Sequence, residues 1–236
     1  MVRLLFSIAA TLLVMGARPV EAAPPLQLVP DSAYRNDAPA PHYAQLDRGR
    51  AVSPMARRQP HPAVQQPARV YLLRGFMNVF SLGMDDLATQ IQANGIAAMV
   101  TNHADAEYLV ARIVAAYQAG DRSPIVLIGH SLGADAVIEM AQDLDRYNIP
   151  VAAAILFDGT APHAVPRNVT TAVNFTQRFE LTPGAEFHGT ISNVDLRGDE
   201  GIDHLTIDKS PSLQAQALGY VLRAASAAPI LPAPRP

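Results

Sequence analysis

The stretch that most constrains this chain runs from Ser123 to Ala134, where an apolar run, a glycine-flanked serine and the start of a helix follow one another. Residues 124–128 are all apolar, and the run has the length of a strand covered on both faces of a parallel sheet. From Leu132 onward the apolar residues recur at helical spacing. The chain therefore changes from strand to helix at Ser131, which predicts a sharp turn that presents the serine side chain.

Two glycines flank this turn, in the sequence Gly129-His130-Ser131-Leu132-Gly133. Gly129 and Gly133 are expected to be glycine because the strand and helix backbones come close there, and a Cβ at either position would collide. His130 is expected to pack or hydrogen-bond beneath the turn. A serine held in such a strained turn is a candidate nucleophile.

This strand, G-x-S-x-G turn and helix resemble the nucleophile elbow of the α/β-hydrolase superfamily, particularly of its lipase, esterase and thioesterase-domain branches. The resemblance extends over residues 69–224 and does not cover the first 68 residues. It implies a serine hydrolase that forms an acyl-enzyme on Ser131.

Further strand and helix patterns alternate along the chain. Besides the run before Ser131, strands are predicted at 69–74, 96–101, 151–157, 169–175 and 190–196, and helices at 81–94, 106–119, 132–144 and from Pro211 onward. This alternation predicts a doubly wound, mainly parallel α/β sheet with right-handed crossovers, a compact α/β-hydrolase fold. Residues 160–168 hold two prolines and no helical period, so the helix usual at this place, and any lid beside it, are expected to be missing. Residues 177–189 likewise offer little secondary structure.

A serine hydroxyl needs a histidine to take its proton, and the histidine needs a carboxylate to fix its tautomer. In α/β-hydrolases the chain order is serine, acid, histidine, which leaves His163, His188 and His204 as possible bases. His204 follows the last predicted strand and precedes the final helix, the position that the resemblance assigns to the base. We therefore take His204 as the candidate base, with the other two as alternatives.

The acid has several candidates. Asp158 ends the strand after the elbow, where thioesterase-like and some lipase-like members carry theirs, whereas most of the superfamily has it after the next strand, which gives Glu180. Three further aspartates lie closer to the candidate base in sequence: Asp195, Asp199 and Asp203. Asp158 is preferred because a carboxylate before Gly159, at the carboxyl end of a strand, lies where such sheets bind ligands. The alternative for Asp158 is an aspartate that only stabilises a turn.

Acyl transfer also needs two backbone N–H donors aimed at the developing oxyanion. One is expected from Leu132, directly after the nucleophile and at the positive end of its helix. The other is expected from Phe76, in Arg74-Gly75-Phe76, which matches the residue after glycine in the family's His-Gly-X motif. Arg74 stands where the family has the histidine, so the side-chain support of this donor must differ.

The first residues are typical of an export signal. Arg3 precedes a largely apolar run over residues 4–15, and Val20-Glu21-Ala22 forms a small-residue cleavage site. The run is shorter than the roughly 20 residues that span a bilayer, so we expect a signal peptide at 1–22 and no membrane span in the mature protein. A periplasmic or secreted location follows.

Two segments are predicted to be flexible. Residues 23–68 are rich in Pro, Gln, Arg and Ala and predict a disordered linker, and 228–236, with its alternating prolines, predicts a tail. The catalytic domain would then cover residues 69–227.

Composition excludes several functions. The net charge of −3, without a basic cluster, argues against a nucleic-acid partner. The chain has no cysteine and no His-x-x-x-His spacing, so we expect no thiol chemistry, no metal and no cofactor. The sequence predicts a secreted or periplasmic serine hydrolase acting on a small acyl ester. The alternatives are a thioesterase or acyltransferase of the same fold, and a non-catalytic envelope or binding protein.

Overall fold

The computed structural model describes residues 67–76 and 81–227 of the chain. The predicted signal peptide at 1–22, the linker up to residue 66 and the tail at 228–236 lie outside the described residues. Ala68, at the end of the predicted linker, is buried in the core. Within the described ranges, no helix combines the length and the apolar character that crossing a membrane requires.

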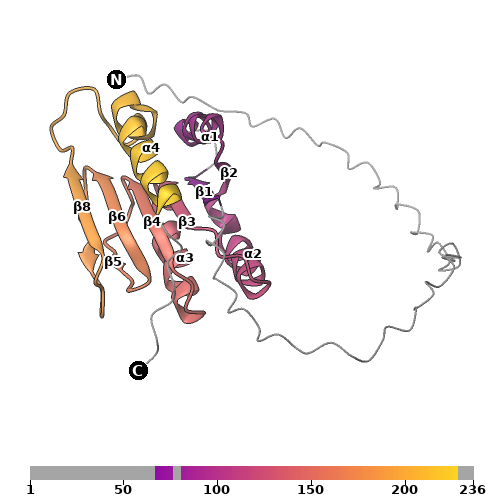
Figure 1. Cartoon of the computed structure of the whole chain (residues 1–236). Helices are drawn as coiled ribbons and strands as arrows, with labels where there is room; N and C mark the ends of the chain where they lie inside the picture. Colours follow the sequence, from indigo (N-terminus) through magenta and orange to yellow (C-terminus); the bar gives the residue numbers. More distant parts are fainter. Residues whose placement is uncertain (1–66, 77–80, 228–236) are drawn as a thin grey trace, which may run out of the picture. The chain divides into compact units, whose positions relative to one another are not determined.

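Six parallel strands form one sheet in the order β2-β1-β3-β4-β6-β8 (Figure 1). Their bounds are β1 Arg69–Arg74, β2 Ala97–Asn102, β3 Ile125–His130, β4 Val151–Phe157, β6 Val169–Thr176 and β8 Thr190–Asp195. The first strand along the described chain, β1, lies inside the sheet. The next strand, β2, is added at its outer side, and β3 pairs with β1 on the opposite side. The doubly wound parallel sheet predicted from the sequence is therefore confirmed, and the strand order reverses between β1 and β3.

Helices cover both faces of the sheet (Figure 1). They are α1 Gly83–Ala93, α2 Ala106–Gln118, α3 Leu132–Arg146 and α4 Pro211–Ser226. The apolar sides of α1 and α4 pack into one core cluster with residues of β1, β3 and β4, while those of α2 and α3 pack into a second cluster on the opposite face. The apolar side of each helix is thus buried against one face of the sheet.

The second half of the sheet has shorter connections. Only the two-residue strands β5 (Ala164–Val165) and β7 (Thr182–Pro183) lie between β4 and β8 besides β6, and they pair with each other in parallel. The helix expected to be missing after β4 is therefore missing in this described stretch. The edge strand β8 contains no buried residue, since no helix from these connections covers it.

Helix α1 begins at Gly83, two residues later than the sequence predicts. The predicted first residue, Ser81, is buried and uses its hydroxyl in contacts with Gly75 and His130 instead of capping the helix. Long-range contacts of this serine thus displace the helix start.

Candidate active site

Ser131 lies in the turn between β3 and α3, with φ 57° and ψ −126°. This backbone conformation is strained for a residue with a side chain. A Cβ on Gly129 would lie 2.1 Å from the carbonyl oxygen of Gly133, and one on Gly133 would lie 2.1 Å from the carbonyl oxygen of Leu73. Only glycine fits at positions 129 and 133, because backbone atoms of α3 and β1 occupy the space that a Cβ would need.

The structure brings Ser131, His204 and Asp158 together. His204 Nε2 lies 3.0 Å from Ser131 Oγ, and His204 Nδ1 lies 2.7 Å from Asp158 Oδ2. A carboxylate can only accept a hydrogen bond, so Nδ1 carries the proton and the lone pair of Nε2 faces the serine hydroxyl. This is the arrangement in which an imidazole can take the proton of a serine.

Asp158 is fully buried at the end of β4 and, like Ser131, has a positive φ, of 48°. Burial acts to raise the pKa of its carboxyl, but hydrogen bonds from His204 and from the Gln177 N–H, together with the positive charge of Arg178, hold that pKa below its usual value. Gln177 N–H donates to Asp158 Oδ1 at 2.9 Å, and Arg178 Nε lies 3.5 Å from Oδ2. The acid therefore stays ionised beside the histidine.

The alternative bases lie elsewhere. His163 Nε2 is bound to Asp135 Oδ1 at 2.9 Å, and His188 is exposed. Neither hydrogen-bonds to Ser131 or Asp158 in the described part of the chain.

The alternative acids are also placed away from His204 Nδ1, which Asp158 occupies. Glu180 and Asp199 are exposed, Asp195 pairs with Arg197, and Asp203 accepts the N–H of Leu205 at 2.8 Å. Asp203 therefore stabilises the turn that carries the histidine without contacting its ring.

The segment after β1 runs beside the nucleophile. A Cβ on Gly75 would lie 2.8 Å from Ser131 Cβ and 3.3 Å from Ser131 Oγ, so Gly75 has no room for a side chain. Phe76 follows directly, and the residue is 64% exposed. The candidate oxyanion donors, the N–H groups of Leu132 and Phe76, thus come from the two segments that flank Ser131. Arg74 does not support the site directly, because its Nε donates to Asp85 on α1 at 2.9 Å.

Two polar residues near the site have roles that the sequence analysis missed, Ser81 and Asp135. Asp135, in the first turn of α3, accepts hydrogen bonds from Thr160 N–H at 3.0 Å and from Ala161 N–H at 3.3 Å, and so holds the loop after Asp158. Neither residue carries a local signal of its role, because an acidic residue is common in the first turn of a helix and a serine is common at a helix start.

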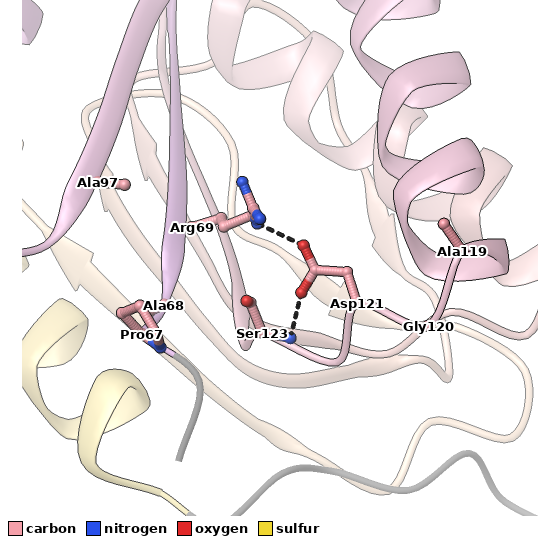
Figure 2. Close-up of a pocket in the computed structure, with 8 residues that line it drawn as sticks. All are labelled: Pro67, Ala68, Arg69, Ala97, Ala119, Gly120, Asp121 and Ser123. Atoms are coloured by element: carbon pink, nitrogen blue, oxygen red, sulfur yellow. Dashed lines mark hydrogen bonds and ion pairs between the residues drawn. The ribbon is translucent and has the colours of Figure 1, made fainter. Parts of the chain in front are cut away.

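A cavity of about 470 Å³ lies at the amino ends of β1 and β2 (Figure 2). Ser131, in contrast, follows the carboxyl end of β3. Arg69 Nε lies 2.6 Å from Asp121 Oδ2, and Ser123 N–H donates to Asp121 Oδ1 at 2.9 Å (Figure 2). These groups bind one another and form no pair of nucleophile and base. No cluster of three or more His, Cys, Asp or Glu side chains suited to a metal occurs among the residues that the structure describes.

The chain is similar to a known protein family over part of its length. The sequence model of the family described as "Thioesterase domain" matches residues 84–188, a range that includes Ser131 and Asp158 but not His204. No curated protein matches the chain. The predicted resemblance to the α/β-hydrolase superfamily, including its thioesterase-domain branch, is confirmed.

Several solved structures are similar to this chain, including the following three. A protein from Xanthomonas campestris pv. campestris, described as a hydrolase of the α/β superfamily, is 18% identical, with 66% of this chain and 96% of that chain covered and a TM-score of 0.39. YbtT, the type II thioesterase of the yersiniabactin biosynthetic pathway, is 12% identical, with 71% and 98% covered and a TM-score of 0.42. Human thioesterase 2 is 12% identical, with 68% and 99% covered and a TM-score of 0.42.

Proposed function

We propose that this chain, which has the α/β-hydrolase fold and is similar to thioesterase domains, is a serine hydrolase that cleaves carboxylic esters through an acyl-enzyme on Ser131. The observation that carries the proposal is the continuous line of hydrogen bonds from Ser131 Oγ through the imidazole of His204 to Asp158. A serine hydroxyl is a weak nucleophile until an adjacent base takes its proton, and this line supplies the base and its orienting acid.

The reaction would proceed in two acyl transfers. As Ser131 Oγ attacks the ester carbonyl carbon, His204 Nε2 takes the hydroxyl proton, and Asp158 stabilises the imidazolium that forms. The N–H groups of Leu132 and Phe76 would bind the oxyanion of the tetrahedral intermediate. The imidazolium then gives its proton to the departing alkoxide. A water molecule, deprotonated by the same nitrogen, attacks the acyl carbon. The bond between that carbon and Ser131 Oγ breaks, and the imidazolium returns the proton to Oγ as the acid leaves.

The surroundings of the site favour acyl groups of short to medium length. Three exposed apolar residues, Phe76, Phe179 and Leu205, come directly after Gly75, Arg178 and His204, which contact Ser131 or Asp158. In this proposal they would offer contact area to an acyl chain. No helix follows β4 to cover such a chain in the described stretch 158–168. Each CH₂ group left in water forfeits about 0.8 kcal/mol of binding, so a long chain gains little here.

Thioester hydrolysis is the second candidate, because the family match is to a thioesterase domain. The predicted signal peptide favours oxygen esters, since acyl thioesters of coenzyme A and carrier proteins are largely cytosolic compounds. A protein exported from the cytosol would rarely meet them.

Labelling with a fluorophosphonate probe tests the proposal. The wild-type protein should be labelled at Ser131 and should turn over p-nitrophenyl esters, whereas Ser131→Ala should lose both properties while its circular dichroism stays unchanged. Ser123→Ala, at the distant cavity, is the matched control and should be labelled like the wild type. Absence of labelling in the wild type, or persistent labelling of Ser131→Ala, would overturn the proposal.

A further inference from the structure

His130, the residue before the candidate nucleophile, connects two segments of the site. Its side chain is buried, with 1% of the residue exposed. Its Nδ1 lies 2.8 Å from Ser81 Oγ, and its Nε2 lies 2.7 Å from the backbone carbonyl oxygen of His204. The two imidazole rings also lie side by side, with their centroids 5.1 Å apart.

The partners of His130 determine where its proton lies. The carbonyl oxygen of His204 can only accept, so His130 Nε2 must donate. In a neutral imidazole Nδ1 then has a free lone pair and accepts from the hydroxyl of Ser81. The same hydroxyl oxygen accepts the N–H of Gly75 at 3.0 Å. The donors and acceptors therefore form one line from Gly75 through Ser81 and His130 to His204.

Burial keeps this ring neutral. It disfavours the imidazolium and lowers the pKa of His130 to about 4, although the hydrogen bond to the His204 carbonyl opposes the shift. Neutrality matters for the neighbouring base, because a positive charge on His130 would repel the imidazolium that forms on His204 during the proposed reaction.

Both ends of the line belong to segments that contact the nucleophile. His204 carries the base, and Gly75 lies against Ser131 and precedes the candidate oxyanion donor at Phe76. We propose that His130 is a positioning residue, which fixes the backbone of His204 directly and the Gly75–Phe76 segment through Ser81. This inference rests on the proposed function, since it assigns His130 a role in the chemistry at Ser131. His130 itself does not touch the reacting atoms.

Two amide substitutions at His130 test its two hydrogen bonds separately: one arm joins Nε2 to the His204 carbonyl, and the other joins Nδ1 to Ser81. In His130→Gln the side-chain nitrogen falls near the position of Nε2 and can still donate to the His204 carbonyl, but the acceptor for Ser81 is lost. In His130→Asn the side-chain oxygen falls near the position of Nδ1 and can still accept from Ser81, but the contact with His204 is lost. Each variant should lower kcat for p-nitrophenyl acetate by about 10- to 100-fold with KM nearly unchanged, because a displacement of about 1 Å in a site can reduce the rate that much.

Ser81→Ala tests whether Ser81 acts through its hydrogen bond to His130, as proposed. In the His130→Gln background it should lower kcat by less than about twofold further, because the arm through Ser81 is already cut. In the His130→Asn background it should lower kcat about as much as it does in the wild type. Equal additional losses in both backgrounds would overturn the inference. His188→Gln, at an exposed histidine, is the matched control and should keep wild-type kcat.

The wild-type protein provides a test that does not depend on how the variants fold. Nitrogen-15 NMR at pH 7 should show His130 as the neutral tautomer with its proton on Nε2. A charged ring or a proton on Nδ1 would overturn the inference, as would kcat within twofold of wild type in both amide variants. Absence of ester turnover by the wild type would instead count against the proposed function, while the tautomer measurement still tests the hydrogen-bonded line.

Discussion

His163 Nε2 lies 2.9 Å from Asp135 Oδ1, so the loop that follows the candidate acid is tied to the helix that follows the candidate nucleophile. The two oxygens of Asp135 also accept the N–H of Thr160, at 3.0 and 3.1 Å. Helix α3, which begins at Leu132 directly after Ser131, therefore anchors the chain that leaves Asp158, through Asp135 in the first turn of the helix. This carboxylate thus joins the segment after the nucleophile to the segment after the acid, in addition to the hydrogen bond from Ser131 N–H to the Phe157 carbonyl.

Asp135→Ala should lower both stability and activity. Removing the carboxylate leaves the N–H groups of Thr160 and Ala161 without their acceptor, and a loss of about 3 kcal/mol in the free energy of unfolding is expected for such a charged acceptor. His163→Ala removes one donor only and should have the smaller effect. Urea unfolding followed by fluorescence, alongside ester turnover, measures both quantities. A larger loss in His163→Ala would contradict this account of the loop.

His204→Ala should lower kcat by about 10³-fold or more, because Ser131 then has no base and the members of such a set act as a unit. His163→Ala and His188→Ala should each retain kcat within about tenfold of wild type, since neither imidazole reaches the serine. Steady-state turnover of a p-nitrophenyl ester compares the three. If either of the other histidines proved essential and His204 did not, the base would have to be reassigned.

Asp158→Asn should lower kcat by about 10⁴-fold, since an amide in this position favours the wrong tautomer of His204. Glu180→Gln is the matched control because Glu180 is exposed after β6, and its kcat should stay near that of the wild type. The same assay applies. The reverse order of the two losses would move the acid to the strand where most of the superfamily has it.

Asp208 should make stability depend on pH. Burial is the largest influence on this fully buried carboxyl and raises its pKa to about 6. Its Oδ2 accepts the N–H of Gly83, but its buried Oδ1 has no hydrogen-bond partner in the described structure. The ordinary pKa of an aspartate is about 4, so between about pH 4 and 6 the folded state binds more protons than the unfolded state. The contribution of Asp208 to the free energy of unfolding is therefore fully present below about pH 4. It falls by up to about 3 kcal/mol as the pH rises through about 6.

Asp208→Asn cannot titrate in this way. The free energy of unfolding of the variant should gain on that of the wild type by up to about 3 kcal/mol between pH 4 and 7. Urea unfolding of both proteins across that range measures the gain. A difference that stays constant with pH would show that the carboxyl has an ordinary pKa.

The substrate preference can be measured with p-nitrophenyl esters from acetate to palmitate, beside matched thioesters. We expect the highest kcat/KM for short to medium acyl chains and no jump in rate when the substrate forms micelles, because a site without a lid needs no interface to open it. A maximum at the longest chain would contradict the uncovered site. A large advantage for thioesters would favour the second candidate function and count against export.

Local features of the sequence predicted the elbow. A Cβ on Gly129 would meet the backbone of Gly133 within the same five residues, whereas a Cβ on Gly133 would meet Leu73 on β1. The strand-turn-helix pattern of adjacent residues was nevertheless enough to indicate the turn. The order serine, acid, histidine left three histidines, and the position of His204 between the last predicted strand and the final helix then selected it. Asp158 is preferred to Glu180 for its place at the carboxyl end of a strand, but the sequence could not show which of the two loops lies beside the histidine ring.

The supporting contacts could not be predicted, since they join distant residues. Ser81 meets His130 across 49 positions, and Asp135 meets the loop at Thr160 across 25. The sequence around Ser81 indicates the start of a helix, and nothing near it reveals the imidazole that it binds. Such pairs are set by how β1, β3 and α3 pack, which periodicity does not encode.

The positive φ angles of Ser131 and Asp158, 57° and 48°, bear on any attempt to engineer this protein. A residue with a side chain costs about 1–3 kcal/mol in this region of backbone space, whereas glycine adopts it freely. Ser131→Gly would release that strain without leaving a buried charge behind. A library selected for heat resistance alone would therefore enrich the substitution that removes the nucleophile, whereas selection that couples survival to ester turnover would retain the strained serine.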